Sequence, residues 1–295
     1  MRSVRDRRFK QEHSDEATPG PQDSIQARNR TPDQVPVAYR ERTPPMNTQL
    51  NLATLDTASP EYAARIAQYD WRRIAEDLDA YGVAILPSLL SADDCATASD
   101  LFADTTLSRM PPVEEMRSWG NGNYRYLRHS TPEIISALRT AIYPRLAPIA
   151  NAWNEKMEID DRYPITHQDY LEICRGAGQI LPTSMLLEHT PGQQTLLHQD
   201  LYGDRAFPLQ VAVVLSQRGA DYSGGEFVIT EQRPRMQTRP EVISLNRGDA
   251  VVFAVSNRPV AGTRGTYRVN LRHGFSKVRE GRQLALSIIF HDAAA

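Results

Sequence analysis

TYRVNLRHGFSKVREGRQLALSIIFH, residues 266–291, contains two short runs rich in β-branched and other apolar residues, with a glycine-containing turn between them. Gly, Pro, Asn or Asp residues separate such runs along the second half of the chain, which is the pattern of strands joined by turns. Roughly six to eight closely spaced strands without intervening helices predict an antiparallel sandwich or barrel. The other runs of this kind are TSMLLEHT (183–190), LQVAVVLSQ (209–217), GEFVIT (225–230) and EVISLNRGDAVVFAV (241–255).

The first half of the chain has a different periodicity. EYAARIAQYDWRRIAEDLDAYG (61–82) carries apolar residues at helical spacing and ends at Gly82, a residue suited to a helix C-terminus. A short strand is predicted in VAILPSLL (83–90), and Ser91 with Asp94 then resembles the capping box that opens a helix.

Two further helices are predicted before the strands begin. TPEIISALRTAIYPRLAPIANAWNEKM (131–157) has a strong helical pattern that we expect to break near Pro144. HQDYLEICRGAG (167–178) predicts a shorter helix.

The first 48 residues are rich in Arg, Asp, Glu, Gln and Pro and show almost no apolar periodicity, so we expect a disordered extension there. Residues 49–295 are expected to form one domain. Its helical part would span 60–178 and its β core 179–293.

The composition excludes several classes of protein. With 40% hydrophobic and 24% charged residues, a chain of 295 residues can bury a sizeable core. A formal net charge of −2 gives no overall basic surface, so duplex nucleic acid is not a favoured partner. Cys95 and Cys174 are too few for a disulfide framework and predict buried thiols in a reducing compartment. No membrane-length apolar run or secretory signal is evident, which predicts a cytoplasmic protein without a membrane partner.

The stretch LLHQDLYGD (196–204) suggests a metal site, because it places a histidine and an aspartate two positions apart. On an extended strand, side chains at this spacing point the same way. His198 and Asp200 would then need a third ligand, for which the candidates are His129, His167, His189, His273 and His291. His273, 75 residues after His198, suits a partner strand. Two imidazoles and one carboxylate form the facial triad of non-haem Fe(II) oxygenases. Nine residues beyond His273, Arg282 could grip a carboxylate through two hydrogen bonds.

This ordered set resembles the Fe(II)/2-oxoglutarate-dependent dioxygenases, whose core is a double-stranded β-helix. The resemblance covers roughly residues 80–293. Within this superfamily, the chain is most similar to a bacterial, prolyl-hydroxylase-like group described as oxidising damaged nucleic acid. It is closest over HQDLYGD (198–204), YSGGEFVIT (222–230), LNRGDAVVFA (245–254) and RVNLRHGFSKVREGRQLALSIIFHD (268–292).

The resemblance implies an α+β fold, a jelly-roll (cupin-like) core with the N-terminal helices packed on one sheet. It implies Fe(II) held by His198, Asp200 and His273, and 2-oxoglutarate held at its distal carboxylate by Arg282. The other reagents would be O2 and ascorbate, the latter as a candidate reductant. A carboxylate at position 200, rather than the small residue of related halogenases, implies hydroxylation.

Several polar and aromatic residues are candidates for binding substrate or cosubstrate. Segment 116–130 carries Gly120 and Gly122, and in similar proteins such a segment covers the mouth of the barrel. Ordinary lid packing, or a solvated loop, is the alternative for its residues. His189 lies on the strand leading to the ligands and is a candidate for contacting the cosubstrate, although a core histidine would also fit. The substrate candidates are Trp119, Asn123, Tyr124, Arg125, Arg128 and Tyr202.

We therefore predict a dioxygenase that hydroxylates a small polar molecule, with a nucleoside or nucleotide as the substrate to test. The alternatives are an oxidative demethylase of damaged nucleic acid, an amino-acid or prolyl hydroxylase, and a metal-binding cupin-like protein without turnover. A zinc hydrolase could use the same three ligands but would leave Arg282 unexplained.

Overall fold

The computed structural model describes residues 59–111, 118–128, 131–263 and 265–294, all within the compact unit Asn51–Ala295. The extension predicted for residues 1–48 lies outside the described residues. In the described part of the chain, no helix is long and apolar enough to cross a membrane.

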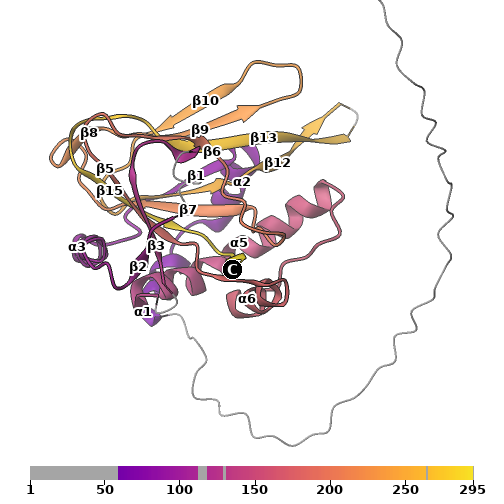
Figure 1. Ribbon diagram of the computed structural model, residues 1–295. Coiled ribbons are helices and arrows are strands. Elements are labelled where there is room, and N and C mark those ends of the chain that lie inside the picture. Colours follow the sequence, from indigo (N-terminus) through magenta and orange to yellow (C-terminus); the bar gives the residue numbers. More distant parts are fainter. Residues whose placement is uncertain (1–58, 112–117, 129–130, 264, 295) are drawn as a thin grey trace, which may run out of the picture. The chain divides into compact units, whose positions relative to one another are not determined.

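In the described residues, five helices precede most of the strands along the chain (Figure 1). Gly82 ends the second of them in the left-handed conformation, and Ser91 and Asp94 close a complete capping box on the third, as predicted. The helices in the described residues are α1 (Pro60–Ala67), α2 (Trp71–Tyr81), α3 (Ala92–Asp100), α5 (Glu133–Lys156) and α6 (His167–Gly176).

Residues 61–82 differ from the single helix that their periodicity predicts, because two helices, α1 and α2, share this stretch. Asp70 begins the second one, since its side chain accepts a hydrogen bond from the backbone N–H of Arg73. An aspartate in this position satisfies one of the free N–H groups of a helix start, so it favours a new helix over a continuous one.

Helix α5 also differs from the prediction, because it continues through Pro144 and Pro148 without a break. An internal proline costs about 3 kcal/mol through its missing N–H and its ring clash. Both prolines lie on the less buried side of α5, whereas Leu146, Ala150 and Trp153 are fully buried on the other. Burial of large apolar side chains contributes about 1.5–3 kcal/mol each, which offsets the cost.

The larger sheet has seven described strands, and three of them come from the half that was predicted to be largely helical: the predicted strand Val83–Leu86, Ser108–Arg109 and one that follows Gly122. This strand, Asn123–Leu127, pairs antiparallel with Met185–His189, and it places segment 118–128 beside the core. Figure 1 shows helices α1, α5 and α6 below this sheet, as predicted for the N-terminal half. In spatial order the strands are β1 (Val83–Leu86), β11 (Ala250–Ala254), β7 (Leu209–Val214), β15 (Gln283–Ile288), β5 (Met185–His189), β3 (Asn123–Leu127) and β2 (Ser108–Arg109).

The smaller sheet lies above the larger one in Figure 1, and rings from both meet between them. Phe227 of the smaller sheet and Phe253 of the larger have ring centroids 4.9 Å apart. Two facing antiparallel sheets with this buried aromatic layer form the double-stranded β-helix that the resemblance implies. The smaller sheet contains β10 (Arg239–Ile243), β9 (Phe227–Gln232), β13 (Gly265–Phe275), β12 (Asn257–Gly262) and β6 (Thr195–His198), the last paired with β13.

Two short antiparallel pairs of strands complete the described strands. Strand β14 (Val278–Gly281) pairs with β8 (Tyr222–Gly224), and β16 (Ala293–Ala294) pairs with β4 (Gln179–Leu181).

Candidate metal centre

Strands β6 and β13 bring two of the predicted ligands together. His198 and His273 are direct partners in the antiparallel register, and their ring centroids lie 4.4 Å apart. Gly274 permits this approach, because a Cβ at that position would collide with the carbonyl oxygen of Thr195. Asp200 follows two residues after the end of β6 and turns back toward both imidazoles.

The three side chains converge on one point. Nε2 of His198 lies 3.2 Å from Oδ1 of Asp200, and Nε2 of His273 lies 3.4 Å from Oδ2. One potential ligand atom from each residue falls within 4.8 Å of the others. Nδ1 of His198 is 2.8 Å from the carbonyl oxygen of Leu196, which can only accept, so Nδ1 carries the proton and Nε2 has its lone pair toward the cluster.

The charges within the cluster shift the pKa values of its three members. Burial alone would raise the pKa of Asp200, but the two imidazoles outweigh it and hold that pKa well below its ordinary value. Burial alone would lower the pKa of His198, but the Asp200 carboxylate raises it. Burial and the neighbouring His198 lower the pKa of His273 to about 4. An ionised carboxylate with a neutral imidazole is the form that binds a divalent metal.

Both Asp200 oxygens also accept hydrogen bonds from outside the cluster. Tyr202 donates its hydroxyl to Oδ1 at 2.7 Å, and Gln210 donates Nε2 to Oδ2 at 2.8 Å. The same Gln210 nitrogen lies 2.6 Å from the hydroxyl of Ser287. Tyr202, predicted to contact substrate, thus has its hydroxyl directed to Asp200.

The cluster opens into a narrow pocket between the two sheets. Its volume is about 20 Å³, room for roughly one water molecule. Trp119 is buried against it, with its ring centroid 6.0 Å from that of His198 and 5.1 Å from that of Tyr124. The other lining residues are Met185, Leu187, Thr195, Gln210, Ala212, Phe227, Phe253, Gly274, Phe275 and Ser287.

Polar side chains gather at one wall of the pocket. The hydroxyls of Tyr124 and Thr195 are 3.0 Å apart, and the Thr195 hydroxyl is 2.8 Å from Nε2 of His189. Burial lowers the pKa of His189 to about 4, although the amide of Gln283 partly opposes this. Gly122 makes room for the arrangement, since a Cβ there would collide with the His189 ring.

Arg282 lies elsewhere. Its side chain is 56% exposed, it forms an ion pair with Glu188, and its guanidinium lies 5.9 Å from the ring centroid of Phe102. The residue that faces inward at this end of β15 is Gln283, which is fully buried opposite His189 in the register. No arginine or lysine lines the pocket among the residues that the structure describes.

Three further candidates lie outside the pocket. Asn123 donates to the carboxylate of Glu188, and Arg128 donates to the carbonyl oxygen of Ser108. The guanidinium of Arg125 lies 4.6 Å from the ring centroid of Phe102. Side chains alternate along β3, so Asn123 and Arg125 face away while Tyr124 faces in.

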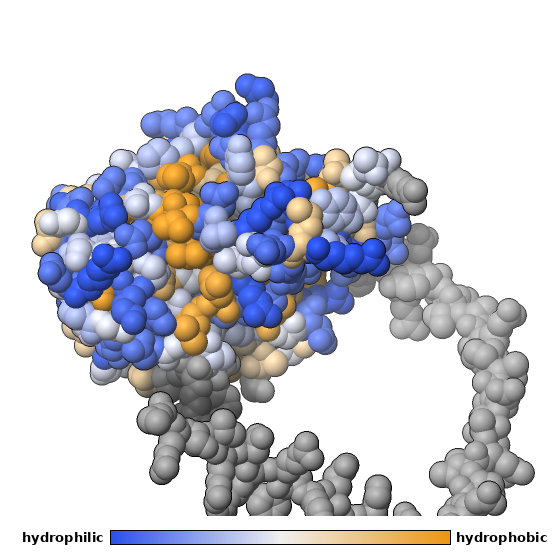
Figure 2. Space-filling model, turned by 90° about the horizontal axis from the view of Figure 1, so that it is seen from above, coloured by the Kyte–Doolittle hydropathy of each residue, from blue (hydrophilic) through white to orange (hydrophobic). Residues whose placement is uncertain are grey.

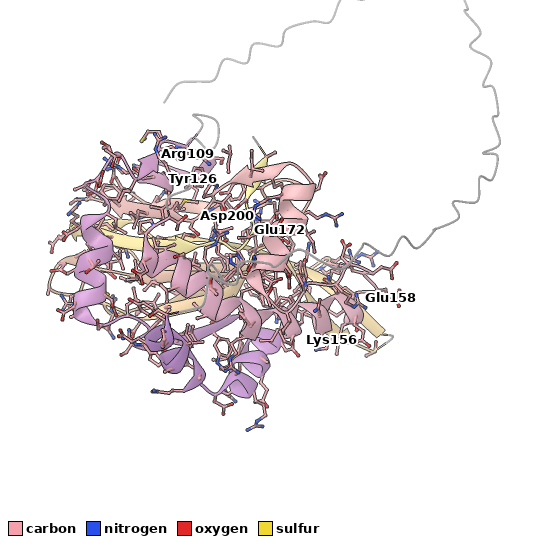
Figure 3. All side chains as sticks on the ribbon, turned by 90° about the horizontal axis from the view of Figure 1, so that it is seen from below. Arg109, Tyr126, Lys156, Glu158, Glu172 and Asp200 are labelled. Carbon is pink, nitrogen blue, oxygen red and sulfur yellow. The ribbon has the colours of Figure 1, made fainter. Side chains whose placement is uncertain are left out.

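The sequence did not indicate that Thr195, Gln210 and Ser287 line the pocket, or that Arg109 contacts the nearby Tyr126. The first three occupy inward-facing positions on strands. Only the patterns of LQVAVVLSQ for Gln210 and RQLALSIIFH for Ser287 could have indicated two of them, and Thr195 opens the short run TLLH, which has no such signal. Arg109 stacks 4.4 Å over the ring of Tyr126, and Figure 3 shows Tyr126 between Arg109 and Asp200.

Comparisons with known proteins agree with this geometry. Residues 122–293, more than half of the chain, match the family described as "Oxygenase, catalysing oxidative methylation of damaged DNA". An uncharacterized protein of Mycobacterium tuberculosis, found in strains CDC 1551 / Oshkosh and H37Rv, is 43% identical over 161 residues. That alignment covers 55% of this chain and 69% of the relative.

Similar solved structures include a prolyl-4-hydroxylase of Pseudomonas putida, 13% identical with a TM-score of 0.44, over 76% of this chain and all of that one. A 2OG-Fe(II) oxygenase family oxidoreductase of Burkholderia pseudomallei is 15% identical with a TM-score of 0.43, over 77% of this chain and 94% of that one. From the family match over residues 122–293, we conclude that the chain belongs to this oxygenase family, and the cluster of His198, Asp200 and His273 is a donor set suited to a non-haem iron.

Proposed function

We propose that this oxygenase hydroxylates a small polar substrate, a nucleoside or nucleotide, at a metal held by His198, Asp200 and His273. The observation that carries the proposal is the convergence of two imidazole nitrogens and one carboxylate oxygen at the pocket. This donor set fits Fe(II), because it occupies one side of the ion and leaves the other side for reactants. Fe(II), 2-oxoglutarate and O2 supply the oxidation: one oxygen atom enters a C–H bond, the other enters succinate, and CO2 is released.

The chain's own contribution is to orient the reactants and to exclude water. Phe227 and Phe253 form the apolar wall behind His273, with ring centroids 6.1 and 4.4 Å from its imidazole. An apolar enclosure of this kind limits the access of water to the reacting groups. Since the pocket holds only about one water, the cosubstrate can enter only if lining side chains move, and Trp119 is the largest of them.

The distal carboxylate of 2-oxoglutarate needs hydrogen-bond donors, and we assign these to Tyr124 and Thr195 with His189 behind them. The hydroxyls of Tyr124 and Thr195 both line the pocket, whereas Arg282 is paired with Glu188 outside it. When Nε2 of His189 donates to Thr195, the Thr195 hydroxyl proton can turn toward a carboxylate. The Tyr124 hydroxyl donates to the carbonyl oxygen of Trp119 at 3.2 Å, so it would join only if Trp119 moves. In this proposal, neutral hydroxyl groups bind the distal carboxylate in place of the guanidinium of Arg282, which the sequence predicts.

The substrate would approach across the apolar rim of the site. Leu196, Leu197 and Leu201 flank His198 and are 44%, 42% and 50% exposed. Figure 2, viewed from the side of β9, β10 and β13, shows apolar side chains gathered on an otherwise largely polar surface. A flat nucleobase can pack on such a rim while its reactive carbon faces the metal.

A second candidate is the oxidative demethylation of damaged DNA, because the matched family is described as acting on damaged DNA. Hydroxylation of an N-methyl carbon gives an unstable product that releases formaldehyde, so the same site could remove a methyl group. The formal charge of −2 favours a single base or a single-stranded segment over a long duplex.

We place the reaction in the cytoplasm. Cys95 and Cys174 are both free and buried, which suits a reducing compartment.

The test is succinate formation by anaerobically Fe(II)-loaded protein given 2-oxoglutarate and O2. The substrate panel contains nucleosides, nucleoside monophosphates, methylated single-stranded oligonucleotides and free amino acids, with formaldehyde measured in parallel. Asp200→Ala should be silent, whereas Asp204→Ala, which removes an exposed carboxylate from the same loop, should retain turnover. Absence of both succinate and 2-oxoglutarate binding in the wild type would contradict the proposal.

A further inference from the structure

The carboxylate of Asp200 is held from two sides by donors that belong to different parts of the fold. Tyr202, in the loop after β6, donates to Oδ1 at 2.7 Å. Gln210, on β7 of the larger sheet, donates to Oδ2 at 2.8 Å. Asp200 is only 1% exposed, so water does not compete for these oxygens.

We propose that Tyr202 and Gln210 are positioning residues that fix the plane of the Asp200 carboxylate for the metal. This inference rests on the proposed function. A carboxylate has about four lone-pair positions, two on each oxygen. The two donors occupy one on each, and the remaining pairs face Nε2 of His198 and Nε2 of His273. Rotation of the carboxylate would break both hydrogen bonds at once.

Each donor is itself held in place. Gln210 is 2% exposed, and Nε2 also lies 2.6 Å from the Ser287 hydroxyl on the neighbouring strand β15. Its amide cannot be reversed, because Oε1 would then face the carboxylate and repel it. The Tyr202 ring packs against Tyr126 and His291, with centroids 6.0 and 5.8 Å away.

The backbone around Tyr202 is anchored as well. Gln179 donates to the carbonyl oxygen of Tyr202 at 2.9 Å and accepts from the N–H of Arg205 at 2.7 Å. Gly203 is required at this contact, because its φ is +81° and a Cβ there would collide with the Gln179 amide. The loop therefore presents the Tyr202 hydroxyl in a fixed direction.

Hydrogen bonds that orient metal ligands commonly change metal affinity by about 10- to 100-fold when they are removed. We expect a loss in this range for Tyr202→Phe, which removes only the hydroxyl, and for Gln210→Met, which keeps the length but removes the donor. Tyr170→Phe is the matched control. It deletes another largely buried tyrosine hydroxyl, which donates to the carbonyl oxygen of Arg205 and does not contact Asp200.

The experiment titrates Co(II) into each full-length, metal-free protein under anaerobic conditions without 2-oxoglutarate. It records the dissociation constant and the visible d–d spectrum, which reports the ligand geometry. Thermal unfolding of the metal-free proteins is measured alongside. The proposal expects Tyr202→Phe and Gln210→Met to bind Co(II) at least tenfold more weakly with an altered spectrum, and Tyr170→Phe to match the wild type.

Two outcomes separate this inference from the proposed function. If the wild type binds Co(II) and both variants bind it equally well with the same spectrum, the positioning role is refuted while the metal site stands. If the wild type itself does not bind Co(II), the proposed metal site is refuted, and with it the proposed function on which this inference rests. Should Gln210→Met not fold, Tyr202→Phe alone decides the question, since it alters a single hydroxyl.

Discussion

Arg282 pairs with Glu188 on the side of the larger sheet that faces away from the pocket, while Gln283 faces inward opposite His189. The guanidinium of Arg282 therefore lies away from the cluster of His198, Asp200 and His273, whereas the sequence spacing predicts that it enters the barrel. In the proposed function, the donors to the cosubstrate lie instead on the inner face of the sheet.

Arg282→Ala should change the KM for 2-oxoglutarate by less than about threefold, because its side chain is 56% exposed and does not line the pocket. Thr195→Val should raise the same KM by about 10- to 150-fold, since a lost hydrogen bond to a charged group costs about 1.5–3 kcal/mol. Initial rates of succinate formation measure both values. A tenfold rise in KM for Arg282→Ala would instead show that Arg282 turns into the pocket when cosubstrate binds.

The metal-free protein should lose stability as the pH falls below about 6.5, and His167 should contribute to that loss. Burial lowers the pKa of His167 to about 3, and the imidazole lies 2.8 Å from the carbonyl oxygen of Phe290. Because the folded pKa is below the unfolded one, the unfolded state binds the extra proton. The contribution of His167 is therefore full above pH 6.5 and declines as the pH falls from there toward 3.

Urea denaturation of the wild type and His167→Gln at pH 7.5 and 5 tests this expectation. The variant should have a shallower acid dependence of the unfolding free energy, by up to about 1.4 kcal/mol per pH unit. Equal slopes for the two proteins would mean that His167 takes up no proton on unfolding.

Phe253→Ala should destabilise the protein by about 3–5 kcal/mol, because the ring is fully buried between the sheets. The ring centroid also lies 4.4 Å from that of His273, so the variant should bind Co(II) more weakly as water enters the site. Phe102→Ala is the comparison, since this ring packs near Arg125 and Arg282 away from the pocket. Phe102→Ala should lose stability without losing Co(II) affinity. If both variants lose Co(II) affinity to the same extent, Phe253 has no specific effect on the metal site.

The sequence predicts the strands and the grouping of His198, Asp200 and His273 because both depend on local signals. Alternation and turn residues mark the strands, and a His-x-Asp pair with a distant histidine narrows the ligands to a few choices. The direction of Arg282 could not be predicted by counting residues from His273. Gly281, with a φ of +75°, ends β14, and the N–H of Arg282 then bonds the carbonyl oxygen of Asp221. This turn decides which of two adjacent side chains enters the core.

The role of Gln210 was equally hidden. Gln210 is a polar residue near the start of the largely apolar run LQVAVVLSQ. The adjacent residues do not indicate that its amide donates to the carboxylate of Asp200, ten positions earlier. Such a contact depends on how β7 and the loop after β6 lie across the pocket, which is tertiary structure.

The uneven burial of the three clustered side chains sets an order for the arrival of a metal ion. The His198 side chain is 13% exposed, whereas those of Asp200 and His273 are 2% and 6% exposed. An ion entering from solvent would meet His198 first, and it would lose most of its water before reaching the nearly inaccessible carboxylate of Asp200. Uptake and loss of the metal should therefore both be slow, so that an ion once bound remains through many turnovers.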